Sequence, residues 1–161
     1  MKRAIWPILN TLLFTIFVPG TVAGYIPYRL TGRYANLSTG PGMWLGAAII
    51  LAGAAIYFIC AWEFAVRGLG TPAPIAPTKY LVTTALHRYV RNPMYLGVAA
   101  AIVGQAVLFR SVHVAEYAFL MLLTAHIFVV TYEEPTLRRQ FGESYEEYRR
   151  KVPRWIPKFR R

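Results

Sequence analysis

The chain has 161 residues, the length of a single domain, and 56% of them are hydrophobic. Charged residues make up 16%, well below the roughly 25% found in soluble domains. The 18 Lys and Arg residues outnumber 7 acidic residues, all of them Glu, so the net charge is +11. This composition argues against an ordinary soluble domain. It also disfavours a nucleic-acid-binding protein, because such a protein needs its basic residues on the solvated face of a soluble fold.

The first long uncharged stretch predicts a membrane span. No charged residue lies between Arg3 and Arg29, and we expect a span over residues 5–27, long enough to cross a hydrocarbon core of about 30 Å. The basic N-terminus followed by this stretch also resembles a signal peptide, with a small-residue cleavage site near Ala23. The uncharged run continues beyond that site, which favours a retained span.

A second uncharged stretch predicts a span over residues 43–66. Gly46 and Gly53, together with several Ala residues, supply the small surfaces that let membrane helices approach closely. The lone Cys60 lies in this apolar run, so neither a disulfide nor a cysteine metal site is expected, and no metal site is predicted anywhere in the chain.

The second half of the chain contains two shorter apolar runs after an irregular segment. Glycines and prolines are dense between residues 68 and 84, which predicts a cytoplasmic, re-entrant-like loop of restricted geometry. Spans are then expected over residues 93–109 and 112–132. The short connection around Arg110 predicts that these two helices form an antiparallel hairpin.

A polar tail follows the last apolar run. Apolar side chains recur there at spacings of three and four residues, which predicts one amphipathic helix over residues 134–152 lying at the membrane interface. These side chains are Leu137, Phe141, Tyr145, Tyr148 and Val152. The fold class expected from the whole pattern is an all-α membrane protein, a single domain over residues 1–161 with about four transmembrane helices.

The distribution of basic residues predicts the orientation. With four spans and a cytoplasmic N-terminus, only Arg29, Arg33 and Arg110 lie outside, and the other fifteen Lys and Arg residues lie inside. We therefore expect an integral membrane protein with both termini in the cytoplasm. Membrane lipids with anionic head groups are the first expected partners.

Polar residues without an evident packing role gather where the spans meet the cytoplasm. Glu133 and Glu134 are adjacent, and like charges disfavour each other's ionised form unless a cation lies against them. They could instead simply begin the tail helix, since acidic residues and a following proline suit the first helical turn. Arg88 and Arg91 could likewise be head-group anchors only.

Three blocks of sequence occur in the order and spacing of a known family. They are Arg91-Asn92-Pro93-Met94-Tyr95-Leu96-Gly97, Glu133-Glu134-Pro135-x-Leu137, and Phe141-Gly142-x-x-Tyr145-x-x-Tyr148-x-x-x-Val152-Pro153-Arg154-x-Ile156-Pro157. Together, over roughly residues 65–157, they resemble the isoprenylcysteine carboxyl methyltransferase superfamily, which includes the membrane phospholipid N-methyltransferases.

The resemblance implies S-adenosylmethionine as the methyl donor, bound on the cytoplasmic side between the last two spans and the tail helix. The carboxylate of the donor suits an arginine, its amino and ribose groups suit carboxylates, and a glycine allows close backbone approach. The implied donor-binding residues are Arg91, Asn92, Tyr95, Gly97, Glu133 and Glu134. Arg91 and Glu134 are also the expected catalytic pair.

One departure leaves the acceptor open. Carboxyl methyltransferases of this superfamily usually have His where Asn92 stands, and Asn is typical of the phospholipid N-methyltransferases. Methyl transfer is a direct displacement, in which alignment can contribute about 7–11 kcal/mol without a base. The acceptor group is therefore an amine, a carboxylate or a thiol. His126, which lies within a span, is either an acceptor-pocket residue or a neutral side chain hydrogen-bonded to a neighbouring helix.

These features predict an S-adenosylmethionine-dependent membrane methyltransferase acting on an amphiphilic or lipid acceptor that enters between the spans. The main alternative is a non-catalytic scaffold or assembly protein of the same fold. A reductase of the related sterol-reductase type is a second alternative, but it requires a nicotinamide site. No glycine fingerprint following a strand is present in the sequence.

Overall fold

The computed structural model describes residues 2–32, 37–68 and 78–158, and every regular element in these ranges is helical. The predicted Gly/Pro-rich loop falls mostly outside the described residues. In chain order the elements are α1 (Lys2–Phe17), the π-helical η1 (Gly20–Tyr25), α2 (Ile26–Thr31), α3 (Pro41–Val66), the 3₁₀ turn η3 (Ala85–Arg88), α4 (Pro93–Leu108), α5 (Val112–Phe128), the π-helical η4 (Val129–Glu133), α6 (Glu134–Phe141) and α7 (Glu143–Lys151).

Three of the described helical runs are long and apolar enough to cross a membrane. They cover Leu9–Thr31, Pro41–Val66 and Val112–Phe141. The helix α4 is equally apolar, but its 16 residues rise only about 24 Å, less than a hydrocarbon core. The described part of this membrane protein is thus all-helical with three candidate spans, and the fourth predicted span stays a prediction.

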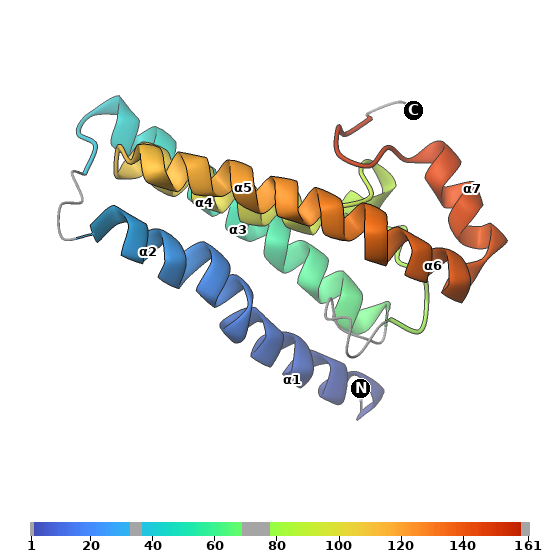
Figure 1. The fold of residues 1–161 in the computed structure, drawn as a ribbon. Coiled ribbons are helices and arrows are strands. Elements are labelled where there is room, and N and C mark those ends of the chain that lie inside the picture. Colours follow the sequence, from blue (N-terminus) through green and yellow to red (C-terminus); the bar gives the residue numbers. More distant parts are fainter. Residues whose placement is uncertain (1, 33–36, 69–77, 159–161) are drawn as a thin grey trace.

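Helices α3 and α4 form the tightest contact of the bundle, antiparallel and side by side (Figure 1). A Cβ built on Gly53 would lie 2.5 Å from the carbonyl oxygen of Gly97, and one built on Gly46 would lie 2.9 Å from that of Gly104. Only residues without side chains permit this approach. The predicted packing role of Gly46 and Gly53 is confirmed.

The first helical run joins the bundle through polar contacts. The Gln105 side chain donates to the carbonyl oxygen of Ala23 at 2.7 Å, and the Tyr117 hydroxyl donates to that of Val22 at 2.9 Å. Both carbonyls belong to η1. In a membrane, where lipid offers no hydrogen bonds, such contacts hold the π-helical segment against α4 and α5.

The hairpin predicted around Arg110 is confirmed. Residues 109–111 connect α4 to α5, and Arg110 adopts a left-handed backbone conformation with φ of 49°. Ser111 caps α5 by accepting a hydrogen bond from the amide of Val114 at 3.4 Å.

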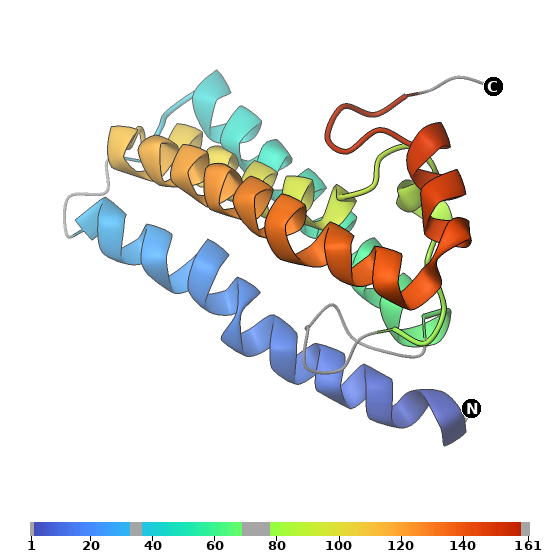
Figure 2. The ribbon, with the colours of Figure 1, turned by 45° about the vertical axis from the view of Figure 1, so that its right-hand side comes forward.

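The predicted single tail helix over residues 134–152 is wrong. The helix that begins with α5 continues through η4 and α6 to Phe141, beyond the predicted span end at residue 132. Gly142, with φ of 54°, then ends it, and α7 turns away in a new direction (Figures 1 and 2). The spacing of the apolar side chains in the tail is compatible with one unbroken helix, which is why the sequence predicted one. A glycine that adopts positive φ without strain made the break possible.

Candidate active site

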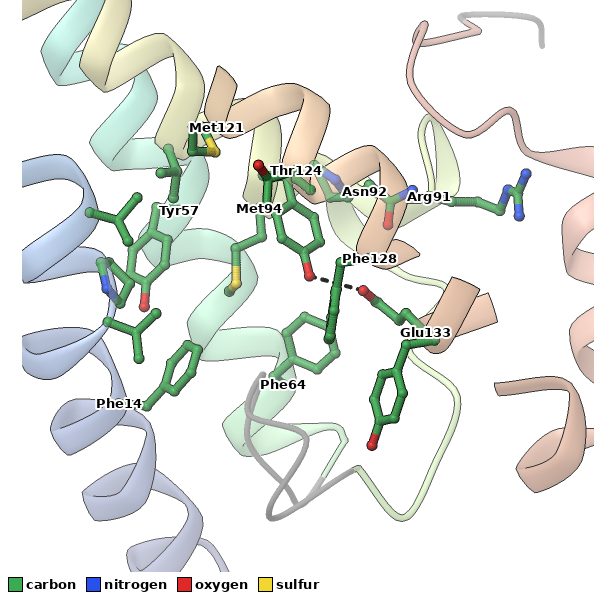
Figure 3. A pocket seen from close by; sticks show the side chains of 18 of the residues that line it. Phe14, Tyr57, Phe64, Arg91, Asn92, Met94, Met121, Thr124, Phe128 and Glu133 are labelled. Atoms are coloured by element: carbon green, nitrogen blue, oxygen red, sulfur yellow. Dashed lines mark hydrogen bonds between the residues drawn. The ribbon is translucent and has the colours of Figure 1, made fainter. Parts of the chain in front are cut away.

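A cavity of about 530 Å³ lies between the first helical run, α3, α4 and the long α5–η4–α6 helix (Figure 3). Apolar side chains form most of its wall. These include Phe14, Val18, Val22, Phe64, Met94, Val98, Met121, Phe128 and Leu137. Polar side chains complete it, among them Thr78, His87, Arg91, Asn92, Tyr95, Tyr132, Glu133, Thr136 and Gln140. The volume is within the range of about 300–1,000 Å³ that is typical of ligand pockets.

The cavity changes in character along its length. One face of the α5–η4–α6 helix lines it from Tyr117 to Gln140, a rise of about 35 Å. Near Met121 the wall carries no charged side chain and its polar groups are the hydroxyls of Tyr117 and Thr124, whereas the opposite end carries Glu133 and Gln140. This gradient suits a ligand with a long apolar part and a polar head.

The two adjacent glutamates, where η4 meets α6, have different surroundings. Tyr132 and Glu133 both line the cavity, although they are consecutive in sequence. Glu134 is not among the lining residues and instead bonds to Arg91 and Arg154. Wide π turns often mark functional sites, because they present side chains that a regular helix would point elsewhere.

The polar end of the cavity is organised by a bond between two helices. The Tyr95 hydroxyl, from α4, donates to Oε2 of Glu133 at 3.0 Å, as the dashed line in Figure 3 shows. One carboxylate oxygen is thereby oriented by α4. The sequence blocks that contain these residues lie far apart in the chain, and the fold brings them together.

Arg91 belongs to a buried ionic cluster. Its Nη1 donates to Oε1 of Glu134 at 2.8 Å and to the Tyr145 hydroxyl at 3.3 Å. Arg154 donates to the same Glu134 carboxylate through Nε at 2.6 Å and Nη2 at 3.1 Å. The expected cation against the glutamate pair is thus present. The Nε of Arg91 is buried without a hydrogen-bond partner among the described residues.

The C-terminal segment is hydrogen-bonded to the residues that precede α4, beside the polar end of the cavity. The amide of Arg91 donates to the carbonyl of Pro153 at 2.9 Å, and the Asn92 side chain donates to that of Arg154 at 3.2 Å. The Tyr148 hydroxyl donates to the carbonyl of His87 at 2.6 Å. Burial raises the pKa of Tyr148, so this hydroxyl keeps its proton at neutral pH.

Four of the six predicted donor-site residues line the cavity: Arg91, Asn92, Tyr95 and Glu133. Gly97 does not, because it faces Gly53 across the α3–α4 contact. In Figure 3 the side chain of Arg91 points away from the centre of the cavity.

Other cavity residues were not predicted. Thr136 and Gln140 follow Tyr132 at spacings of four residues on one helix face, a pattern that the sequence contains. His87 directly precedes Arg88, yet nothing in the sequence indicated a role for it. His126 lies outside the cavity wall, and its Nδ1 accepts a hydrogen bond from Trp155 at 2.9 Å. Its partner is thus the C-terminal segment rather than a neighbouring helix.

Comparison with known proteins places the chain in a family. Residues 41–144, well over half of the chain, match the family described as phospholipid methyltransferase. The chain is also similar to the protein-S-isoprenylcysteine O-methyltransferase of Schizosaccharomyces pombe, with 38% identity over 78 residues. The matched region is 48% of this chain and 33% of that relative, so it spans about a third of the relative's length. The chain belongs to the phospholipid methyltransferase family.

Proposed function

We propose that the protein transfers a methyl group from S-adenosylmethionine to an amphiphilic or lipid acceptor at the cytoplasmic face of the membrane. The observation that carries this proposal is the cavity, which joins a polar end around Glu133 and Tyr95 to an apolar end around Met121. Family membership supports methyl transfer as the chemistry. The isoprenylcysteine acceptor named for the yeast relative and a phospholipid are both amphiphiles of the kind the cavity suits.

The residues at the polar end fit the methyl donor. When bound, S-adenosylmethionine supplies a methyl group carried on a positively charged sulfur. Glu133 offers a carboxylate to its amino or ribose groups, and Arg91, which also lines the cavity, places a positive charge near its carboxylate. The rings of Phe128 and Tyr132 offer π faces, which attract cations.

The remaining residues hold this arrangement in place. Glu134 fixes the guanidinium of Arg91, so we assign it a positioning role for the donor site. Asn92 anchors the C-terminal segment beside the polar end by donating to the carbonyl of Arg154. Gly97 lets α4, and with it Tyr95, lie directly against α3. For a direct displacement such fixed alignment can supply about 7–11 kcal/mol.

Donor binding tests the proposal. Replacing Glu133 by Gln is expected to weaken S-adenosylmethionine binding roughly ten- to hundredfold, because a charge-assisted hydrogen bond contributes about 1.5–3 kcal/mol. Isothermal titration calorimetry on the purified protein measures the affinity for S-adenosylmethionine. Glu116→Gln is the matched control, since Glu116 is exposed near the other end of α5.

Two outcomes would contradict this assignment. Wild-type protein that binds no donor would favour the non-catalytic scaffold. Wild-type binding with an unaffected Glu133→Gln variant would keep the enzyme but move its donor site away from η4.

We further propose that α4 is a fourth span and that both termini are cytoplasmic. Cysteine labelling tests this topology, since the native Cys60 is buried. Ser38 is buried as well, so the exposed neighbour Leu37 is the better outside position. We expect an impermeant reagent to label Leu37→Cys from outside and Ser144→Cys only from the cytoplasm. Labelling of the Ser144→Cys variant from outside would exclude this topology.

A further inference from the structure

Trp155 contacts two helices of the bundle, although it belongs to the C-terminal segment. Its indole Nε1 donates a hydrogen bond to Nδ1 of His126 on α5 at 2.9 Å. Its ring also lies edge-on to that of Tyr95 on α4, with centroids 6.3 Å apart and an angle of 69° between the planes. Aromatic rings at such distances favour this edge-on geometry. One side chain thus joins α4, α5 and the C-terminal segment.

The backbone on both sides of Trp155 is held in place. Before it, the carbonyls of Pro153 and Arg154 accept hydrogen bonds from the residues that precede α4. After it, the amide of Lys158 donates to the carbonyl of Tyr89 at 3.0 Å. The indole therefore starts from a fixed backbone, and its two ring contacts decide where it lies.

His126 is a specific acceptor for this indole. An indole N–H can only donate a hydrogen bond, so Nδ1 of His126 is the unprotonated ring nitrogen and the ring carries its proton on Nε2. The side chain is exposed on α5, within the candidate span Val112–Phe141. An ionisable side chain within a span is costly and is a functional candidate by default. The bond to Trp155 indicates what His126 does there.

Neither residue belongs to the sequence pattern that carries the family resemblance. Trp155 occupies a position that the third sequence block leaves open, directly after Arg154. His126 lies outside all three blocks, ahead of Glu133. The contact between them is therefore a feature of this chain in addition to the residues of the shared pattern.

This contact reaches the candidate donor site through Tyr95. The Tyr95 hydroxyl donates to Oε2 of Glu133 at 3.0 Å, and both residues line the cavity. Because Trp155 packs against the Tyr95 ring, it restricts the tilt of that ring and with it the position of the hydroxyl. The hydroxyl in turn orients the Glu133 carboxylate. His126, Trp155 and Tyr95 thus form a chain of contacts from the exposed side of α5 to the polar end of the cavity.

We propose that Trp155 and His126 are positioning residues for the methyl donor, acting through Tyr95 on the carboxylate of Glu133. Neither is among the residues that line the cavity, so neither is a catalytic residue. The inference rests on the proposed methyl transfer and deepens it, because it makes the geometry of the donor site depend on two residues outside the cavity.

The affinity of the purified protein for S-adenosylmethionine, measured by calorimetry, tests this inference. Trp155→Phe keeps an aromatic ring but removes the N–H donor, and His126→Phe removes the acceptor. Each is expected to weaken donor binding about three- to tenfold, as for the loss of one neutral hydrogen bond. The double variant should lose no more, since both changes remove the same bond. His126→Asn, whose Oδ1 stands near the place of Nδ1, should recover most of the affinity.

Two further measurements separate positioning from a merely structural role. His126→Phe removes a polar ring from an exposed position within a span, so the unfolding temperature should not fall although the donor affinity does. In a Tyr95→Phe background, which lacks the hydroxyl bonded to Glu133, Trp155→Phe should cause no further loss of donor affinity. Trp62→Phe, the same change at a tryptophan on α3 that is 61% exposed, should behave as wild type.

Three results would overturn the inference. The first is unchanged donor affinity in both Trp155→Phe and His126→Phe. The second is an equally large loss from Trp155→Phe with and without the Tyr95 hydroxyl, and the third is a joint fall of stability and affinity in His126→Phe. Wild-type protein that binds no donor would contradict the proposed function as well. It is distinguishable from wild-type binding with unaffected variants, which contradicts this inference alone.

Discussion

Replacing Glu134 by Ala is expected to destabilise the protein by about 3–5 kcal/mol, because removing one partner of a buried ion pair leaves the other charge uncompensated. The side chains of Glu134 and Arg91 are 6% and 9% exposed, and Arg154 shares the same carboxylate. The cluster links the start of α4, the start of α6 and the C-terminal segment. Loss of this cluster should therefore loosen the packing of these three segments against one another at the polar end of the cavity.

Thermal unfolding of the purified protein in detergent measures this loss. Glu147→Gln is the matched control, since it removes an ion pair with Lys151 on the exposed side of α7 and should leave the unfolding temperature unchanged. Glu134→Gln keeps the shape and one acceptor, so it should fall between wild type and the alanine variant. An alanine variant as stable as wild type would show that the cluster does not hold the tail.

Replacing Gly53 by Leu is expected to separate α3 from α4. Even a Cβ at this position would lie 2.5 Å from the Gly97 carbonyl and 2.6 Å from the Ala101 amide. These are backbone atoms, which cannot rotate away as side chains can. Overpacking in a well-packed core costs about 1–3 kcal/mol, and a full leucine against backbone should reach or exceed the upper value.

Gly24 provides the control for this substitution. A Cβ there would meet nothing within 4 Å, so Gly24→Ala should leave the unfolding temperature unchanged. The Gly53→Leu variant should also lose donor binding, because Tyr95 lies on α4 two residues before Gly97. A Gly53→Leu protein with wild-type stability and donor affinity would contradict the close α3–α4 contact.

Several features followed from local sequence alone. Long uncharged runs predicted the first two candidate spans, since hydrophobic length needs no knowledge of partners. The predicted start of the last span was correct, but its predicted end was too early. Glu133 and Glu134 had been interpreted as the start of a separate tail helix. The glycines at positions 46 and 53 predicted close packing, although the sequence did not show that Gly97 and Gly104 face them.

The sequence by itself determined a helical membrane protein with its polar residues gathered near residues 87–97 and 132–135. The tertiary structure alone decided that Glu133 faces the cavity while Glu134 binds Arg91 and Arg154. It also decided that the tail breaks at Gly142 and that His87 lies in the cavity wall, with no hydrogen-bond partner for its Nδ1 among the described residues. Periodicity reports which residues share one face of one helix. It does not predict π-helical turns or contacts between segments that are tens of residues apart in sequence. Those contacts form this site.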